Sequence, residues 1–258
     1  MDETQLKKTV NSSGFPLQIA IESLIKETHR EHRWRVLFSE HSWANLDTDE
    51  SGFIDLILEH KDRSSLLIVE CKRVQNTSWV FLQGEADINS QSNAKAWCTK
   101  EESGRIQKFG WFDPPVDPPT AESAFCVVAG QDAKSRPMLE RLASEVVAST
   151  EGFAIEDRSF LKGSSDYARY YFSAIVTTAD LMVCNFDPNK VVIGNGEMDD
   201  AKFTNVPYLR FRKQISTYKM PEATWKESTA RKIARHKENT VFVINANAFI
   251  DFLRVFFD

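Results

Sequence analysis

Three charged residues in two neighbouring apolar segments have the types and spacing that metal-dependent phosphate chemistry requires. Asp55 lies within the apolar stretch 52–59, and Glu70 and Lys72 follow four consecutive aliphatic residues, 66–69. Two carboxylates held close together resist ionisation unless a cation lies between them. Mg²⁺ binds one or two carboxylates, keeps several waters and contacts substrate phosphates. We therefore predict a Mg²⁺ site at which water attacks a phosphodiester and Lys72 faces the developing negative charge.

Two strands joined by a short turn would bring these residues together. Segments 52–59 and 65–72 are expected to be strands, with a turn at 61–63. Strict alternation places Glu70 with Lys72 on one face of the second strand, and it groups four residues on one face of the first: Phe53, Asp55, Ile57 and Glu59. In a hairpin, Asp55 can lie beside Glu70. Two carboxylates and one ammonium group are thus expected to converge.

Ile54-Asp55, followed by Glu70-Cys71-Lys72-Arg73 after the aliphatic run, resembles the PD-(D/E)XK motif of restriction-endonuclease-like nucleases. The resemblance covers about residues 15–73. It departs from the motif at Ile54, where the motif has a proline that many members of the family lack. The resemblance implies that Asp55, Glu70 and the backbone carbonyl of Cys71 bind Mg²⁺, with Mn²⁺ as a substitute. It also implies that Lys72 orients or deprotonates the attacking water.

The same resemblance implies a glutamate contributed by the first helix. Glu22 is our candidate, since it is the acidic residue nearest the apolar face of residues 17–25. Gln18 lies one turn earlier on the same side. Residues 14–18 also resemble a relative's pattern with glutamate in the place of this glutamine, so Glu22 and Gln18 both stay candidates.

Helices and strands are expected to alternate along the chain. The predicted helices cover residues from 15 or 16 to 33, 92–102, 135–150 and 246–256, where a stripe of phenylalanines is expected to line a core. Beyond the two strands above, the predicted strands are 34–43, 78–82, 123–129, 174–183, 206–212 and 240–244, while 113–119 is rich in turn residues and 194–196 forms a hairpin turn.

This alternation favours an α/β fold with a central mixed β-sheet flanked by helices. By resemblance, the core would be of the restriction-endonuclease-like type, with additional α/β elements at the C-terminal end. We expect a single domain over residues 1–258, with the motif region at 15–73 and a basic C-terminal elaboration at about 202–258.

The composition is that of a globular protein with a sizeable core: 258 residues, 42% hydrophobic and 27% charged. Its apolar runs are too short to cross a bilayer, and the polar first residues lack a secretory segment, so we expect a cytoplasmic protein without membrane contact. Four well-separated cysteines with no CxxC pair are expected to be reduced thiols.

The charge is unevenly distributed. The formal net charge is −5, yet residues 202–237 hold ten basic and two acidic residues, a net of +8 that leaves −13 for the rest of the chain. A basic segment on an acidic protein predicts a surface for phosphates. Its basic residues are Lys202, Arg210, Arg212, Lys213, Lys219, Lys226, Arg231, Lys232, Arg235 and Lys237.

The function we expect is that of a Mg²⁺-dependent DNA endonuclease. By fold-level analogy it could be the cutting subunit of a bacterial defence or repair system. Cutting two strands requires two sites, which a homodimer or a partner in a multi-subunit system could provide. RNA stays open as the substrate. The alternative is a catalytically silent subunit of the same fold that binds nucleic acid or a protein partner, which Gln18 in place of a glutamate would support.

Overall fold

The computed structural model describes residues 2–45, 49–84, 91–130, 137–161, 166–215, 234 and 237–256. The α-helices are α1 (Glu3–Ser12), α2 (Phe15–His32), α3 (Met138–Leu161) and α5 (Phe249–Val255), and short 3-10 helices cover Pro188–Lys190 and Ala246–Ala248. The strands up to α3 are β1 (Trp34–Asn45), β2 (Glu50–His60), β3 (Ser65–Lys72), β4 (Ser78–Gln83), β5 (Gln91–Asn93), β6 (Ala96–Glu102), β7 (Arg105–Phe112), β8 (Pro115–Thr120), β9 (Glu122–Ser123) and β10 (Phe125–Val128). The later strands are β11 (Tyr167–Thr177), β12 (Asp180–Asn185), β13 (Lys202–Asn205), β14 (Tyr208–Gln214) and β15 (Glu238–Asn245).

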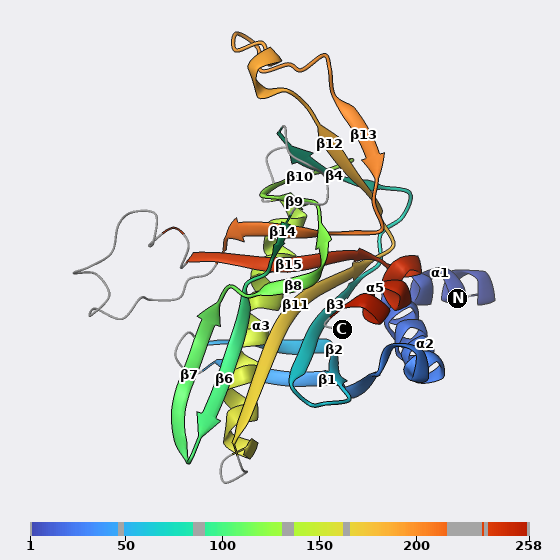
Figure 1. Cartoon of the computed structure of the whole chain (residues 1–258). Coiled ribbons are helices and arrows are strands. Elements are labelled where there is room, and N and C mark those ends of the chain that lie inside the picture. Colours follow the sequence, from blue (N-terminus) through green and yellow to red (C-terminus); the bar gives the residue numbers. More distant parts are fainter. Residues whose placement is uncertain are drawn as a thin grey trace.

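A mixed sheet built from nine of the described strands forms the centre of the molecule (Figure 1). Its main order is β1-β2-β3-β11-β15-β14-β9. The first three strands are an antiparallel meander, whereas β3, β11 and β15 run parallel. The hairpin of β6 and β7 joins the sheet through the first half of β11. The predicted α/β fold with a large mixed sheet flanked by helices is confirmed.

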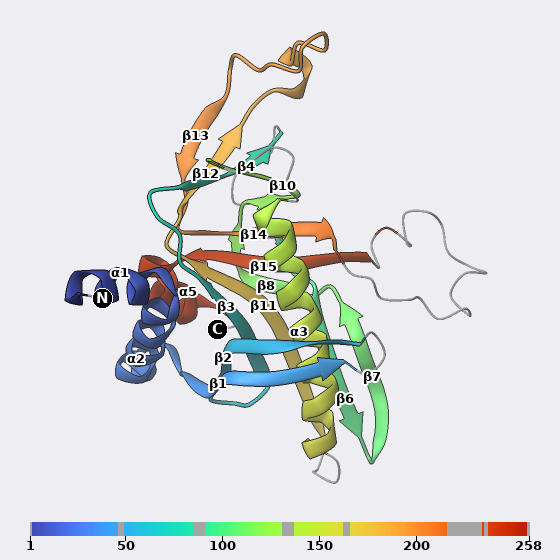
Figure 2. The ribbon, with the colours of Figure 1, turned by 180° about the vertical axis from the view of Figure 1, so that it is seen from behind.

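Helices cover the two faces of this sheet. Leu66 and Ile68 of β3 pack in one apolar cluster with α3, and Leu67 and Val69 pack in the other cluster with α2 and α5. Figure 2 shows α3 lying across the strands on the face turned away from the viewer in Figure 1. The phenylalanine stripe of α5 is buried in the second cluster, as expected for a core. Among the described helices, none is long and apolar enough to cross a membrane.

The elements that carry the motif were predicted closely. The helix from residue 15, the three-strand meander and the turn between β2 and β3 are confirmed. The turn at 194–196 is confirmed too, since Val192 bridges Glu197 around it and Gly196 has a φ of 74°. The cysteines are free thiols, as expected.

Other expectations were wrong. The predicted helix at 92–102 is β5 and β6, because β6 is buried between β7 and β11 and pairs with both. The first residues, for which no element was predicted, form α1, whose first turn is capped by the Asp2 side chain. The turn-rich segment contains β8, and the single strand expected at 174–183 is two strands, β11 and β12, that belong to different sheets.

A smaller sheet, ordered β10-β4-β12-β13, packs beside the central one. Its inner residues Trp79, Phe81, Leu181 and Val183 join the cluster against α3. The chain between β12 and β13 extends from this sheet as an arm, at the top of Figure 1. This second sheet lies at the opposite side of the core from the β1–β2 hairpin.

Candidate active site

The candidate site lies where the parallel strands β3 and β11 end. Glu70 pairs in register with Ile175, and Lys72 with Thr177. The hydroxyl of Thr178 accepts a hydrogen bond from the backbone N–H of Val74 and donates one to its carbonyl, both at 2.8 Å, which fixes the chain as it leaves the two strands. The carboxyl ends of parallel strands are where α/β sheets bind ligands.

Asp55 reaches this edge through a local break in the sheet. Regular pairing between β2 and β3 stops at Leu56 and Val69. Beyond it, Asp55 Oδ2 accepts the backbone N–H of Cys71 at 2.6 Å. The alternation expected through 52–59 is wrong here, because Ile54 packs on the α3 side like Ile57, whereas Leu56 packs on the opposite side. A hydrogen bond from the β3 backbone thus fixes the Asp55 carboxylate beside that strand.

Asp55, Glu70, Cys71 and Lys72 line one pocket of about 210 Å³. Arg73, Gln18 and the α1–α2 junction at residues 12–15 complete its wall. The structure therefore brings together Asp55, Glu70, Cys71 and Lys72, and of the two candidates on the first helix it places Gln18 at this pocket. Glu22 is not among the residues that line this pocket; its carboxylate pairs with Lys26 at 2.5 Å.

The pKa values of both carboxyl groups are raised. Burial, and then the charges of Asp55 and Glu145, raise the pKa of Glu70 to about 7 against the opposing effect of Lys72. Burial also raises the pKa of Asp55, and Glu40 adds to that effect, while the Cys71 N–H and Lys72 lower it. The positive charge of Lys72 therefore does not offset the burial of these two carboxyl groups and the negative charges around them.

Glu40 on β1 is a residue of this site that the sequence did not indicate. Gln18 is 6% exposed, and its Nε2 donates to Glu40 Oε1 at 2.6 Å and to the Asp55 carbonyl at 3.1 Å. Glu40 has a φ of 52°, a left-handed conformation that is uncommon outside glycine and costs free energy. The side chain of Gln18 thus connects the backbone of Asp55 to a third carboxylate.

The donors suit Mg²⁺ better than a transition metal. Within the described residues, no three His, Cys, Asp or Glu side chains form a group that could hold a metal ion. The pocket offers two carboxylates and a backbone carbonyl, a set that fits Mg²⁺ because this ion retains several of its waters. Burial and the nearby carboxylates raise the pKa of the Cys71 thiol, which therefore stays protonated and is a poor ligand. The raised pKa values of Asp55 and Glu70 are those expected of carboxylates that a cation would stabilise.

The basic segment is different from what we predicted. Arg210 is fully buried and donates to the carbonyls of Val116 and Pro118 and to the Thr120 hydroxyl at 2.6–2.8 Å. Arg212 pairs with Asp113 and Glu238, and Lys213 with Glu140. These three cations are engaged by other groups of the protein, and the burial of Arg210 removes it from any surface that phosphate could reach. A phosphate-binding role for the rest of the segment stays a prediction. Lys202 and Lys237 are exposed, and the other five basic residues of the segment, Lys219, Lys226, Arg231, Lys232 and Arg235, lie outside the described residues.

Comparison of the chain with protein-family profiles, with curated proteins and with solved structures finds no match.

Proposed function

We propose that this protein is a Mg²⁺-dependent nuclease that hydrolyses phosphodiester bonds of DNA. The observation that carries the proposal is the convergence of Asp55, Glu70 and Lys72 in one pocket at the end of β3. Asp55, Glu70 and the backbone carbonyl of Cys71 would hold Mg²⁺, which supplies the Lewis acid and lowers the pKa of a bound water. Mn²⁺ is expected to substitute for it.

The order of the elements supports the assignment to a restriction-endonuclease-like core. Along the chain, α2 precedes the meander β1-β2-β3, and α3 precedes β11, which lies parallel to β3. This order of a helix, three antiparallel strands, a helix and a parallel strand is compatible with that core. Because one fold serves many functions, it is the pocket that carries the functional argument.

Each side chain of the pocket has a distinct task in this mechanism. The Cys71 N–H fixes the Asp55 carboxylate at the pocket that Glu70 also lines. Lys72 forms no salt bridge with a described carboxylate. As an ammonium group it can face the phosphate while negative charge builds, and as the neutral amine it could instead take the proton of the attacking water. Arg73 beside it would contact a neighbouring phosphate.

The biological setting remains part of the proposal. A cutting subunit of a bacterial defence or repair system fits a nuclease that acts on DNA, and a homodimer would supply the two sites that cutting both strands needs. A second candidate is a catalytically silent subunit that binds nucleic acid or a protein partner. Gln18 favours this second candidate. Its side chain contacts the backbone of Asp55, at a position where the related nucleases would have a glutamate.

A cleavage assay tests the proposal directly. Purified protein is incubated with supercoiled plasmid, linear duplex, single-stranded DNA and RNA, each with Mg²⁺, Mn²⁺ or EDTA. We expect metal-dependent cutting of DNA that is lost in Lys72→Ala and Glu70→Gln but kept in Lys61→Ala, which removes an exposed lysine from the other end of the same hairpin. DNA binding without cutting under every condition would favour the silent subunit, and cutting of RNA alone would change the substrate.

A further inference from the structure

Glu40 is an acidic residue that lies opposite another acid in the sheet. It follows Ser39, which pairs with Leu56, so the register of β1 and β2 places Glu40 opposite Asp55. Like charges opposite each other on neighbouring strands destabilise a sheet. Within the described residues, no lysine, arginine or histidine forms a salt bridge with Glu40. The position of this carboxylate therefore costs stability that no cation offsets.

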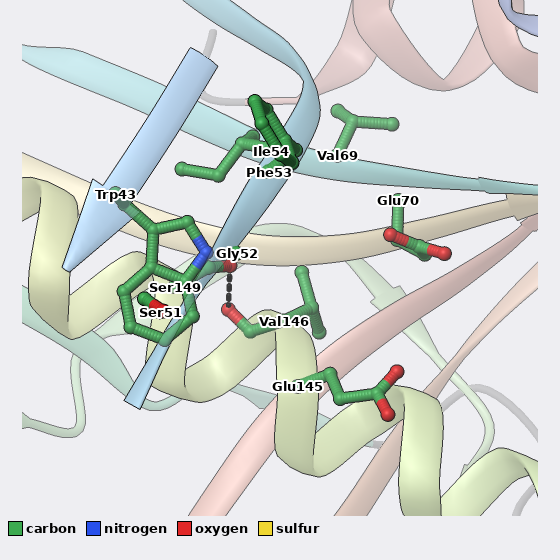
Figure 3. Close-up of a pocket in the computed structure, with 10 residues that line it drawn as sticks. All are labelled: Trp43, Ser51, Gly52, Phe53, Ile54, Val69, Glu70, Glu145, Val146 and Ser149. Carbon is green, nitrogen blue, oxygen red and sulfur yellow. Dashed lines mark hydrogen bonds between the residues drawn. The ribbon is translucent and has the colours of Figure 1, made fainter. Parts of the chain in front are cut away.

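Glu145 is the other acid near the candidate metal ligands, and it differs from Glu40 in having a cation. With Glu70 it lines a pocket of about 290 Å³ between β2 and α3. Figure 3 shows Glu145 of α3 on the same side of this pocket as Glu70, with Trp43 at the other end. The guanidinium of Arg141 donates to Glu145 at 3.4 Å. Glu40 has an amide as its partner instead.

This amide is the buried side chain of Gln18, whose Nε2 donates to Glu40 Oε1 at 2.6 Å and to the Asp55 carbonyl at 3.1 Å. An amide nitrogen carries two hydrogens, and these two acceptors use both of them. A carboxylate and a backbone carbonyl both accept, so exchanging the amide oxygen and nitrogen would bring acceptor against acceptor twice. Glu40 and the Asp55 carbonyl thus fix the orientation of the Gln18 amide.

The backbone of Glu40 is strained as well. Its φ of 52° lies in the left-handed region, where glycine is favoured and glutamate is uncommon. Residues in such conformations cluster at functional sites, where the surrounding structure holds them in place. Glu40 is exposed, so packing of its side chain does not explain the strain. The hydrogen bond with Gln18 is the contact that this conformation provides.

We propose that Glu40 is a positioning residue of the candidate site and acts through Gln18. It holds the NH2 group of the amide, so that the amide oxygen is presented to the metal pocket that Gln18 lines. The inference rests on the proposed function, in which this pocket holds Mg²⁺. An amide oxygen can bind Mg²⁺ or accept a hydrogen bond from one of its waters, whereas an NH2 group would repel the cation. Glu40 is not itself a ligand, because no three described acids, histidines or cysteines form a group that could hold a metal ion.

The test separates the hydrogen bond of Glu40 from its charge. Glu40→Gly removes the carboxylate at a φ that glycine adopts without strain, so the variant is expected to fold. Glu40→Gln removes the charge but keeps an oxygen that can accept from Gln18. The control is Glu27→Gln, at an exposed glutamate of α2. For each protein, the rise of Tm with Mg²⁺ concentration gives the affinity for the ion, and initial rates give the cleavage of DNA.

We expect Glu40→Gly to bind Mg²⁺ roughly tenfold more weakly than the wild type, as removal of a group that orients a ligand commonly does. Its cleavage rate at limiting Mg²⁺ should fall with the affinity. Glu40→Gln should stay within about threefold of the wild type in both measurements, because the amide of Gln18 keeps its orientation. Glu27→Gln should match the wild type.

The outcomes separate this inference from the proposed function. Equal Mg²⁺ binding by Glu40→Gly and the wild type would overturn the role of Glu40 and leave the nuclease intact. Binding by Glu40→Gln as weak as that by Glu40→Gly would also overturn it, since Glu40 would then act through its charge. If the wild type cuts nothing, the nuclease proposal fails and Mg²⁺ binding decides alone: weaker binding by Glu40→Gly that Glu40→Gln restores supports the role, and a wild-type Tm that Mg²⁺ does not change overturns it.

Discussion

Glu70, a proposed ligand of Mg²⁺, is costly to ionise in the metal-free protein, because its carboxyl group is buried near two other carboxyl groups, those of Asp55 and Glu145. Its pKa is raised from 4.5 to about 7 by burial and by Asp55 and Glu145. Between these values the folded state keeps a proton that the unfolded state has lost, so stability falls as the pH rises from about 4.5 to about 7. The penalty is fully present above that range.

We therefore expect Glu70→Gln to stabilise the metal-free protein at pH 8 by roughly 2–3 kcal/mol and to change it little at pH 4.5. Urea unfolding in EDTA at the two pH values measures the difference. Mg²⁺ should stabilise the wild type but not the variant, since the cation binds the ionised pair. A gain of equal size at both pH values would mean that the glutamine acts through packing and not through charge.

Gln18 is expected to act through Asp55, which it contacts at the backbone carbonyl, and through Glu40. Gln18→Ala should lower kcat/KM by roughly 10- to 100-fold, because small displacements of a reacting group are costly. Gln18→Glu would place a carboxylate beside Glu40 and should raise the Mg²⁺ concentration required. The matched control is Gln107→Ala, an exposed glutamine on β7. Loss of stability with an unchanged rate would make Gln18 a purely structural residue.

The principal residues of the pocket could be predicted because each has a local sequence signature. Asp55 interrupts an apolar strand, and Glu70 and Lys72 follow one. Glu40 has no such signature: it lies in a polar stretch of β1 and approaches Gln18 through a left-handed backbone conformation. The packing of Trp43 was equally hidden, since the ring lies against two glycines a hundred residues apart in the chain, Gly52 and Gly152.

The packing of α3 against β1 depends on the missing side chain at Gly152. We expect Gly152→Ala to destabilise the protein by roughly 1–3 kcal/mol, although the same change in an open helix position stabilises it. The added methyl group must displace the Trp43 ring. Thermal unfolding measures the effect.

The double variant with Trp43→Phe provides the control for this change. A smaller ring leaves room for the methyl group, so alanine at 152 should cost less in the Trp43→Phe background. If the two effects simply add, the contact between Gly152 and Trp43 does not determine the packing of α3.

Elements with local periodicity were predicted well, and those that depend on distant partners were not. The β1-β2-β3 meander has short turns and apolar stretches that reveal it. Segment 92–102 has helix-compatible residues, but its partners β7 and β11 bury it as a strand. The parallel pairing of β3 with β11 joins residues about a hundred positions apart, and periodicity within either segment says nothing about that partnership.

Across the whole molecule, the distribution of charge decides where a polyanion can bind. The net charge of −5 disfavours approach of DNA in general. Arg210, Arg212 and Lys213 are engaged inside the protein, which leaves Lys72 and Arg73 as the described cations at the pocket. If the proposed function is correct, Lys72, Arg73 and the proposed metal would supply most of the attraction for phosphate.

Arg73 lies at the pocket and Arg212 is held in ion pairs, so we expect opposite effects from replacing these two arginines. Arg73→Ala should reduce the slope of log affinity against log salt by about one, because each phosphate contact releases about one counterion, and leave stability nearly unchanged. Arg212→Ala should keep the slope and lose roughly 2–3 kcal/mol of stability, since Asp113 and Glu238 would lose their partner. Anisotropy titrations at several salt concentrations, beside urea unfolding, distinguish the two. A slope reduced by Arg212→Ala in a protein that is still folded would mean that Arg212 leaves its ion pairs to bind DNA, and the basic segment would then regain the role that the sequence predicted for it.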